Sequence, residues 1–372
     1  MINAGRLWAM ARKEAIQLRR DTRSLVLAFL LPVLLLILFG YAISFDVRNI
    51  RTAVLDEDNS AQSRALLESF RSSGYFSVER RLARSGEIAP LLDGVRVQLV
   101  LVIPADFSAA LNSGRPAEVQ AVVDGSDANT ATIILAYARA IVTRYALDVQ
   151  FAGRRVVPPV RLESRVWYNE ELASRNMIVP GLVAVIMMIV AAMLTSLTIA
   201  REWERGTMEQ LAATPVARTE VVLGKLLPYV AIGLIDVVLI SVLGVWLFDV
   251  PFRGNALFFM AASTLFLIGG LGLGIVISTV GRSQLLATQV AMIATFLPAF
   301  LLSGFMYSIS VMPAGLQAVT YLIPARYFIV VTRGVFLKGV GPEALWLQGL
   351  LMIAFAAASL TLAIRVFRKE LE

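Results

Sequence analysis

Long apolar runs separated by short polar stretches dominate the chain. A helix needs about 20 mainly apolar residues to cross a bilayer, and six runs of the sequence reach that length. They are Leu25 to Phe45, Met177 to Ile199, Val221 to Phe248, Ala256 to Val280, Leu285 to Ser303 and Leu345 to Val366. The pattern predicts a polytopic α-helical membrane protein with six transmembrane helices.

Residues 46–176, between the first two runs, have a different pattern. "TAVLD" and "VQLVLVIP" are typical of short apolar strands, and "AEVQAVVDG" alternates more weakly. "NSAQSRALLESFRSSG" and "DANTATIILAYARAIVTRYALDVQFAG" have helical spacing, with N-cap residues at their starts and glycines at their ends. We expect an inserted α/β domain here. The alternative is a disordered linker, which the apolar strands argue against.

Two further segments have patterns of their own. Residues 1–24 place apolar side chains on one helical face and basic ones around the other, as in an amphipathic helix that lies in the membrane interface. Its apolar face holds Leu7, Trp8, Met10, Ala11, Ala15 and Leu18. Residues 304–342 are apolar but interrupted, and we expect two short re-entrant helices there, before the last span. The interruptions are Pro313, Pro324, Gly334, Gly339 and Gly341.

The composition agrees with a membrane protein and narrows the chemistry. Of 372 residues, 58% are apolar and 16% are charged, and there is no cysteine and no histidine. Disulfides, thiol chemistry, imidazole catalysis and the usual zinc sites are therefore excluded, and we expect no metal site and no enzyme activity. The string Gly224-Lys225-Leu226 lacks the hydroxyl residue and the upstream glycine of a phosphate loop, so it does not predict a nucleotide-binding site in this chain.

The distribution of Lys and Arg predicts the orientation in the membrane. Basic residues precede the first span, fill the connections after the second and fourth spans, and follow the sixth. Because positively charged loops stay in the cytoplasm, both termini are expected to be cytoplasmic. Residues 46–176 then lie on the far side, and their sixteen arginines balance sixteen acidic residues, so the net charge of +7 belongs to the membrane part.

These expectations divide the chain into four regions. Residues 1–24 form a cytoplasmic amphipathic interfacial helix, and residues 25–45 form the first transmembrane helix. Residues 46–176 form a periplasmic or extracellular α/β domain. Residues 177–372 form a transmembrane domain of five helices.

A compact charged segment, "REWERGTMEQLAATPVART", connects the second and third spans from Arg201 to Thr219. Its charges are spaced along a short helical pattern that Pro215 ends, and Thr219 is placed to cap the next helix. A helix of this kind suits docking on a protein partner. From the charge pattern alone, an ordinary solvated loop is an equally good interpretation.

The same segment resembles the signature of type-2 ATP-binding cassette (ABC) exporter permeases, in which an E-R-G-T-x-E-Q-L-x-x-T-P string follows the second span. "FLLSGFMYSISVMPAGLQAVTYLIPARYFIVVTRGVFLKGVG" resembles the family's segment before its last span. "ARKEAIQLRRDTRSLVLAFLLPVLLLILFGYAI" is similar to its opening. The resemblance covers nearly the whole chain, and the large insert resembles the subgroup of bacterial permeases for multidrug or ion export.

The resemblance implies a permease subunit of an exporter in the bacterial inner membrane, which moves a hydrophobic or amphipathic, drug-like compound outward. It implies that two permeases, identical or different, form the pathway, and that separate ATPase subunits bind ATP and Mg. A periplasmic adaptor and membrane lipid are further expected partners, and nucleic acid is not. By motif, residues 201–215 would form the ATPase coupling helix, with the N-terminal helix as a second contact. The coupling residues would be Glu202, Glu204, Arg205, Gly206, Thr207, Glu209, Gln210, Thr214 and Pro215.

Three features inside the spans need an explanation. Asp236 lies near the middle of the third span, where a carboxylate is costly. It is a candidate for the translocation pathway. A structural hydrogen bond to a neighbouring helix or protonation in place is the alternative, and the sequence slightly favours it because no basic partner is visible. Lys225 is expected to snorkel to the membrane surface. The glycines of "FLIGGLGLGI" favour close packing between helices over a flexible segment.

Two other classes of function compete with transport. One is a membrane-anchored sensor or scaffold that signals through its exported domain, but no signalling or DNA-binding module follows the last span. The other is an intramembrane enzyme. The lack of His and Cys, and of paired carboxylates at membrane depth, argues against it.

Overall fold

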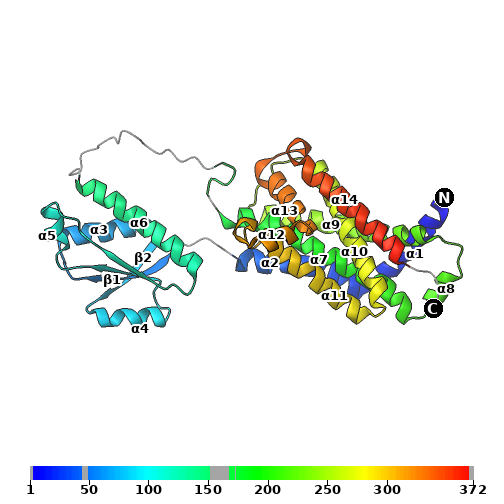
Figure 1. Ribbon diagram of the computed structural model, residues 1–372, viewed down its shortest axis with the longest axis horizontal. Coiled ribbons are helices and arrows are strands. Elements are labelled where there is room, and N and C mark those ends of the chain that lie inside the picture. Colours follow the sequence, from blue (N-terminus) through cyan, green and yellow to red (C-terminus); the bar gives the residue numbers. More distant parts are fainter. Residues whose placement is uncertain (1–2, 44–48, 151–166, 172, 368–372) are drawn as a thin grey trace. The chain divides into compact units, whose positions relative to one another are not determined.

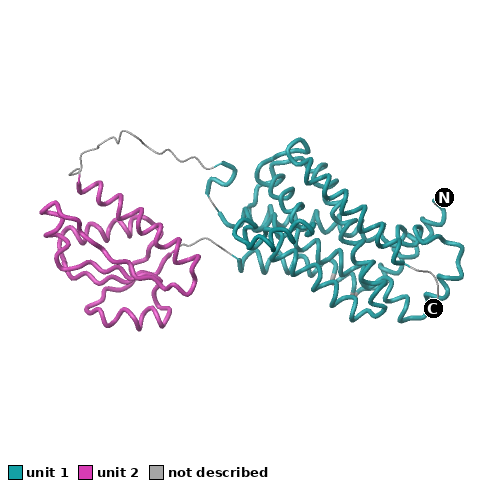
Figure 2. The backbone as a smooth tube through the Cα atoms, in the orientation of Figure 1, with its two compact units in different colours: residues 1–44, 165–372 teal, residues 45–164 magenta. Residues whose placement is uncertain are grey.

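The computed structural model describes residues 3–43, 49–150, 167–171 and 173–367, and it divides the chain into two compact units. One unit comprises Met1–Ser44 and Arg165–Glu372, and the other comprises Phe45–Ser164 (Figures 1 and 2). The first unit is helical and the second contains a sheet, so each has its own core and is described separately.

The smaller unit is built on a four-stranded sheet with the strand order β2-β1-β3-β4. Strand β1 (Ile50–Asp56) pairs in parallel with both β2 (Phe76–Leu82) and β3 (Leu99–Ile103), and β3 pairs antiparallel with β4 (Gln120–Val123). Parallel strands need helices on the faces of the sheet. Accordingly the two inner strands, β1 and β3, are buried at most of their positions.

Helices cover both faces of this sheet (Figure 1). On one face, α3 (Ala61–Ser72), α5 (Phe107–Asn112) and α6 (Ala128–Gln150) contribute to a core that includes Ile50, Phe70 and Ile134. On the other face, α4 (Ile88–Asp93) packs through Leu91 on Leu55 and Val100. The sequence pattern anticipated β1, β3, β4, α3 and α6. It missed β2, α4 and α5.

Among the described residues of the larger unit, six helices are long and apolar enough to cross a membrane, as predicted. They are α2 (Thr22–Ala42), α7 (Ser174–Glu204), α9 (Arg218–Phe248), α10 (Ala256–Gly281), α11 (Gln284–Leu297, extended by a π-helical turn, Pro298–Leu302) and α14 (Pro342–Val366). The shorter helices are α1 (Ala4–Arg20), α8 (Met208–Ala212), α12 (Ala314–Thr320) and α13 (Pro324–Arg333).

Helix α7 is the axis of this unit. In the most apolar 18-residue stretch of α7, 89% of the residues are buried within the protein. The same fraction is only 18% to 28% in α2, α9, α11 and α14. A helix that is apolar all round is a buried one. The helices α2, α9, α10, α11 and α13 all pack against α7. The charged segment follows the polar end of α7, so it is directly connected to a helix that contacts most of the bundle.

Glycines and hydroxyl groups allow α10 to approach α7 closely. The Thr195 hydroxyl donates to the Leu271 carbonyl at 2.8 Å, and the Ser278 hydroxyl accepts the backbone N–H groups of Ile199 and Ala200, each at 2.9 Å. Gly274 lies between these contacts, and a Cβ there would meet Thr195 and the backbone of α7. The expected packing role of the glycine run is thus confirmed.

The helices α12 and α13 form a bent pair before the last span. A π-helical turn, Gly334–Lys338, extends α13. The pair Ala314–Thr320 and Pro324–Lys338 bends by 78°, and it is apolar enough to be either a broken span or a re-entrant loop. Pro324 starts α13 at a position where no intrahelical N–H bond is needed. Near the end of α13, the Arg333 side chain donates to the carbonyls of Met177 and Gly304, each at 3.3 Å, and so ties the pair to the start of α7.

Candidate functional site

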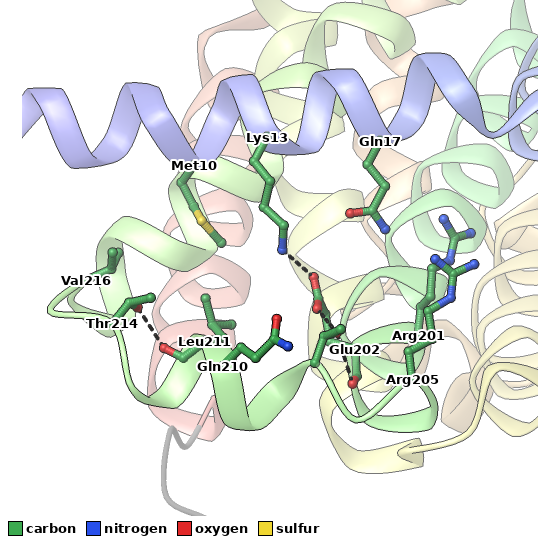
Figure 3. Close-up of a pocket in the computed structure, with 11 residues that line it drawn as sticks. Met10, Lys13, Gln17, Arg201, Glu202, Arg205, Gln210, Leu211, Thr214 and Val216 are labelled. Carbon is green, nitrogen blue, oxygen red and sulfur yellow. Dashed lines mark hydrogen bonds and ion pairs between the residues drawn. The ribbon is translucent and has the colours of Figure 1, made fainter.

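The first helix, α1, packs on the first part of α9 and reaches the end of α7 through the ion pair of Lys13 with Glu202 (Figure 3). Its start is fixed by Glu220, whose carboxylate accepts the backbone N–H of Asn3 at 2.7 Å and that of Ala217 at 2.8 Å. Arg6 donates to the Pro215 carbonyl at 2.7 Å. Helix α9 therefore begins at Arg218, and the prediction that Thr219 caps it is wrong, because Glu220 bonds the backbone one turn earlier.

Four charged residues of α1, α7 and α9 form a group, here called the ion cluster, in which all members except Lys13 are buried: Lys13, Glu14, Glu202 and Lys225. The Lys225 ammonium lies 2.9 Å from the Glu14 carboxylate and 3.3 Å from that of Glu202. Lys13 approaches the same Glu202 oxygen at 2.9 Å, and the Tyr229 hydroxyl donates to Glu14 at 3.1 Å. The cluster thus joins the interior of α1 to the end of α7 and the first turns of α9.

Burial makes the ion cluster a strong constraint. The side chains of Lys225, Glu14 and Glu202 are 0%, 2% and 4% exposed. A buried charge is tolerated when an opposite charge and hydrogen bonds replace water. The expectation that Lys225 snorkels to the surface is therefore wrong, because α1 covers this end of α9 and supplies Glu14 as its partner.

A second ion pair joins α2 to the end of α7. Arg201 lies 2.7 Å from Asp21, which also accepts a 2.7 Å hydrogen bond from the Ser24 hydroxyl. Partial burial raises the pKa of Asp21, but the hydrogen bonds from Ser24 and the charge of Arg201 outweigh it, so this pKa lies below its usual value. Asp21 also caps the start of α2, and the span is thereby fixed to α7.

The charged segment folds as the last turn of α7, a tight turn and the separate helix α8. Gly206 makes the turn with a φ of 67°, in the left-handed region that favours glycine. The Thr207 hydroxyl donates a hydrogen bond to the Glu202 carboxylate, which links α8 to the ion cluster. Met208 and Leu211 point inward and are buried, whereas Glu209 and Gln210 are exposed.

The other motif residues have different surroundings. Glu204 accepts hydrogen bonds from the backbone and side chain of Gln284, at the start of α11. The Thr214 hydroxyl donates to the Leu211 carbonyl at 2.7 Å, which closes the turn after α8. Arg205 is exposed. The nine motif residues are thus gathered at one end of the bundle, but Glu202 faces the interior and cannot belong to an outward surface.

A cavity of about 340 Å³ opens between α1 and this segment. Figure 3 shows Met10, Lys13 and Gln17 of α1 directed toward it from one side, with the α7–α8 residues opposite. It is lined by Met10, Lys13, Gln17, Arg201, Glu202, Arg205, Thr207, Gln210, Leu211, Thr214 and Val216. In the described part of the chain, no group of three or more His, Cys, Asp or Glu is placed to hold a metal ion.

Asp236 lies apart from this site, about 16 Å further along α9 than Lys225 at 1.5 Å per residue. It is fully buried, and neither carboxylate oxygen has a hydrogen-bond partner among the described residues. Its face of α9 is the packed one, since Gly233 contacts Leu267 of α10 and Gly244 contacts Val179 of α7. The structural hydrogen bond considered from the sequence is not present.

The sequence interpretation missed the partners in the ion cluster. The signal was present in α1, where Glu14 lies one turn from both Met10 and Leu18, on the face that the structure buries. A carboxylate on an apolar face requires a cation, and Lys225 is the matching residue near the end of α9. Trp8, assigned to the apolar face from the sequence, is 69% exposed.

Comparison with known proteins agrees with this architecture. Residues 22–365 match the family described as "ABC-2 family transporter protein". The chain is 38% identical over 353 residues to "Probable multidrug ABC transporter permease YbhS" of Escherichia coli (strain K12), covering 94% of this chain and 93% of the relative. It is 31% identical over 369 residues to "Probable multidrug ABC transporter permease YbhR" of the same strain, covering 98% and 99%. "Inner membrane transport permease YhhJ" of that strain is 28% identical over 335 residues.

The family match spans all six apolar helices and the α/β unit, and the relatives match over nearly their full lengths. The chain therefore belongs to the ABC-2 family of transporter proteins, as a permease subunit.

Proposed function

We propose that this chain forms the translocation pathway of an ABC exporter together with a second permease copy, and that separate ATPase subunits dock on α8. The observation that carries the proposal is the construction of α8. Met208 and Leu211 anchor it inward, Thr207 ties it to the ion cluster, and Glu209 and Gln210 remain exposed to a partner. ATP and Mg would bind to the partner, as membership of the family implies.

The charge distribution supports an orientation with α1, α8 and both termini in the cytoplasm. The arginines and lysines around α1, the α7–α9 connection and Arg282 lie at one end of the spans, and positively charged loops stay inside. In this orientation the α/β unit is periplasmic, where it would contact an adaptor protein or a second copy. The bent pair α12–α13 then enters from the outer surface as a re-entrant hairpin.

Coupling would proceed through the ion cluster. A push on α8 acts on Glu202 through Thr207, and Glu202 bridges Lys13 of α1 and Lys225 of α9. The ends of α1, α7 and α9 would therefore move together. Because α7 packs against five other helices, displacement of its end would change the arrangement of the bundle around the pathway.

The test of ATPase docking is the charge reversal Glu209→Lys. Glu209 is exposed, so a lysine at this position does not disturb the core. The carboxylate in the first turn of α8 would attract a cationic surface of the ATPase, and a lysine would repel it. We expect substrate-stimulated ATPase activity of the assembled complex to fall on the order of 10-fold, equivalent to ~1.4 kcal/mol.

The matched control is Glu68→Lys, the same reversal at an exposed position of α3. It should leave stimulated ATPase activity at the level of the unmodified complex. Unchanged coupling in Glu209→Lys, with normal assembly, would remove α8 from the docking surface.

The proposed substrate is a hydrophobic or amphipathic compound. The relatives YbhS and YbhR are named as multidrug permeases, which supports a drug-like substrate for this chain. We assign Asp236 a contact with a cationic group of such a substrate, because a carboxylate at membrane depth without a partner is costly unless it serves a charge that passes by.

The variant Asp236→Asn distinguishes this contact from a packing role. We expect export of a cationic amphiphile to fall about 10-fold, ~1.4 kcal/mol, while export of a neutral compound of similar size continues. Asp249→Asn, the same change in an exposed residue just after α9, is the control. Equal effects of Asp236→Asn on both compounds would mean that the residue serves the fold.

A further inference from the structure

A second cleft lies beside the cavity of Figure 3, between the end of α1 and the end of α7, with a volume of about 440 Å³. Four of its seven lining residues are cationic. They are Lys13, Arg20, Arg201 and Arg205, and the lining is completed by Ile16, Gln17 and Asp21. The two hollows share Lys13, Gln17, Arg201 and Arg205.

The charges around this cleft do not cancel. Lys13 is paired with Glu202, and Arg201 with Asp21. The guanidinium groups of Arg20 and Arg205 are exposed and have neither an ion pair nor a hydrogen bond within the described residues. Two positive charges are therefore left over at the rim of one cleft.

The walls of the cleft add further polar groups. Gln17 contributes a side-chain amide from α1, and Arg201 lies opposite on α7, where it is paired with Asp21 at 2.7 Å. Together with the guanidinium groups of Arg20 and Arg205, the Gln17 amide favours an anion with several acceptor oxygens.

The depth of the cations limits which anion can reach them. Arg20 precedes Ser24, where the apolar part of α2 begins, by about one helical turn, and Arg205 follows Ile199, the end of the apolar run predicted for the second span, by six residues, or about 9 Å along a helix. The polar layer beside the hydrocarbon core of a bilayer is about 5–8 Å thick. The long side chains of both arginines can therefore reach the level of the lipid headgroups.

We infer that this cleft binds the phosphate of an anionic phospholipid headgroup in the leaflet on the α1 side of the protein. Arg20 and Arg205 bind the phosphate oxygens with their planar donor groups, and the Gln17 side-chain amide adds a further donor. A net anionic lipid is favoured over a zwitterionic one, because the cations attract the whole headgroup. The bound lipid links α1 to α7 beside the ion cluster, and so makes the joint between these helices dependent on the composition of the membrane.

The experiment measures the thermal unfolding of the purified full-length permease in detergent during titration with phosphatidylglycerol, phosphatidylcholine or inorganic phosphate. A ligand of the folded state raises the melting temperature with its concentration. We expect phosphatidylglycerol to raise it and the other two to have little effect. In R20Q/R205Q the apparent affinity for phosphatidylglycerol should fall by about 10-fold or more, as expected for two basic residues at the membrane surface.

The matched control is R12Q/R19Q, which removes the same charge from exposed positions of α1 that do not line the cleft. It should retain the response to phosphatidylglycerol. The variant R20K/R205K keeps the charge without the planar donors, and should lose less affinity than R20Q/R205Q.

Other results would overturn the inference. Equal losses in R20Q/R205Q and R12Q/R19Q would mean diffuse attraction to the surface. An equal response to phosphatidylcholine would remove the requirement for an anionic lipid, and an equal response to inorganic phosphate would assign the cleft to a soluble anion. If R20Q/R205Q binds the lipid normally but loses the ATPase subunit, the cleft belongs to the protein interface.

Discussion

The permease is expected to lose about 3–5 kcal/mol of folding stability when Lys225 is replaced by methionine, because removing one partner of a buried ion pair leaves an uncompensated charge. Lys225 is fully buried, and Glu14 beside it is 2% exposed and has no other cationic partner among the ion pairs of the described residues. The apparent melting temperature of the purified protein, measured by size-exclusion chromatography after heating, should fall by roughly 6–10 °C.

Two further variants separate the lost pair from the lost side chain. The double variant Glu14→Gln/Lys225→Met removes both charges and leaves Glu202 paired with Lys13, so most of the lost stability should return. Lys13→Met removes a cation whose side chain is 48% exposed, and its cost should stay below about 1 kcal/mol. If Lys225→Met unfolds at the same temperature as the unmodified protein, the buried ion cluster does not exist as described.

The second large effect is expected at the contact between α7 and α10. In Gly274→Ala, the new Cβ would lie 2.6 Å from the Ala192 carbonyl and would also collide with the Thr195 hydroxyl. Thr195 would lose its hydrogen bond to Leu271, and the backbone of α7 cannot retreat because that helix is buried all round. We expect a loss of about 2–3 kcal/mol, at the upper end of the usual cost of overpacking.

The control for this substitution is Gly349→Ala in α14, where a Cβ meets nothing within 4 Å. Alanine is the better helix former, so this variant should be as stable as the unmodified protein or slightly more stable. Melting temperatures of the two variants, measured side by side, test the difference. Equal melting temperatures would contradict the close approach of α10 to α7.

The sequence predicted the six spans well because lipid leaves long apolar runs few alternatives to a helix. It predicted the strands with apolar side chains and missed β2, an edge strand whose exposed residues Glu79, Arg80 and Arg81 hide its alternation. Edge strands commonly carry such charges, which discourage pairing with other chains.

For the candidate site, the sequence predicted the location but not which of the charged side chains are buried. The motif placed the charged segment at one end of the bundle, but it could not show which of its charges face inward. Glu202 and Glu209 look alike in the sequence, and the first is buried between two lysines while the second is exposed. Pairing over long sequence distances, as between Glu14 and Lys225, depends on how α1 folds back on α9, which no local pattern encodes.

The burial of α7 within a single chain decides what two copies can share. A helix that is almost completely buried has no surface left for a second subunit, so the interface of the proposed dimer would be formed by helices with exposed apolar faces, such as α2, α9, α11 and α14. Within each subunit, a tilt of α7 would move the helices that pack around it. The interface between the two subunits could then open without separating α7 from its neighbours.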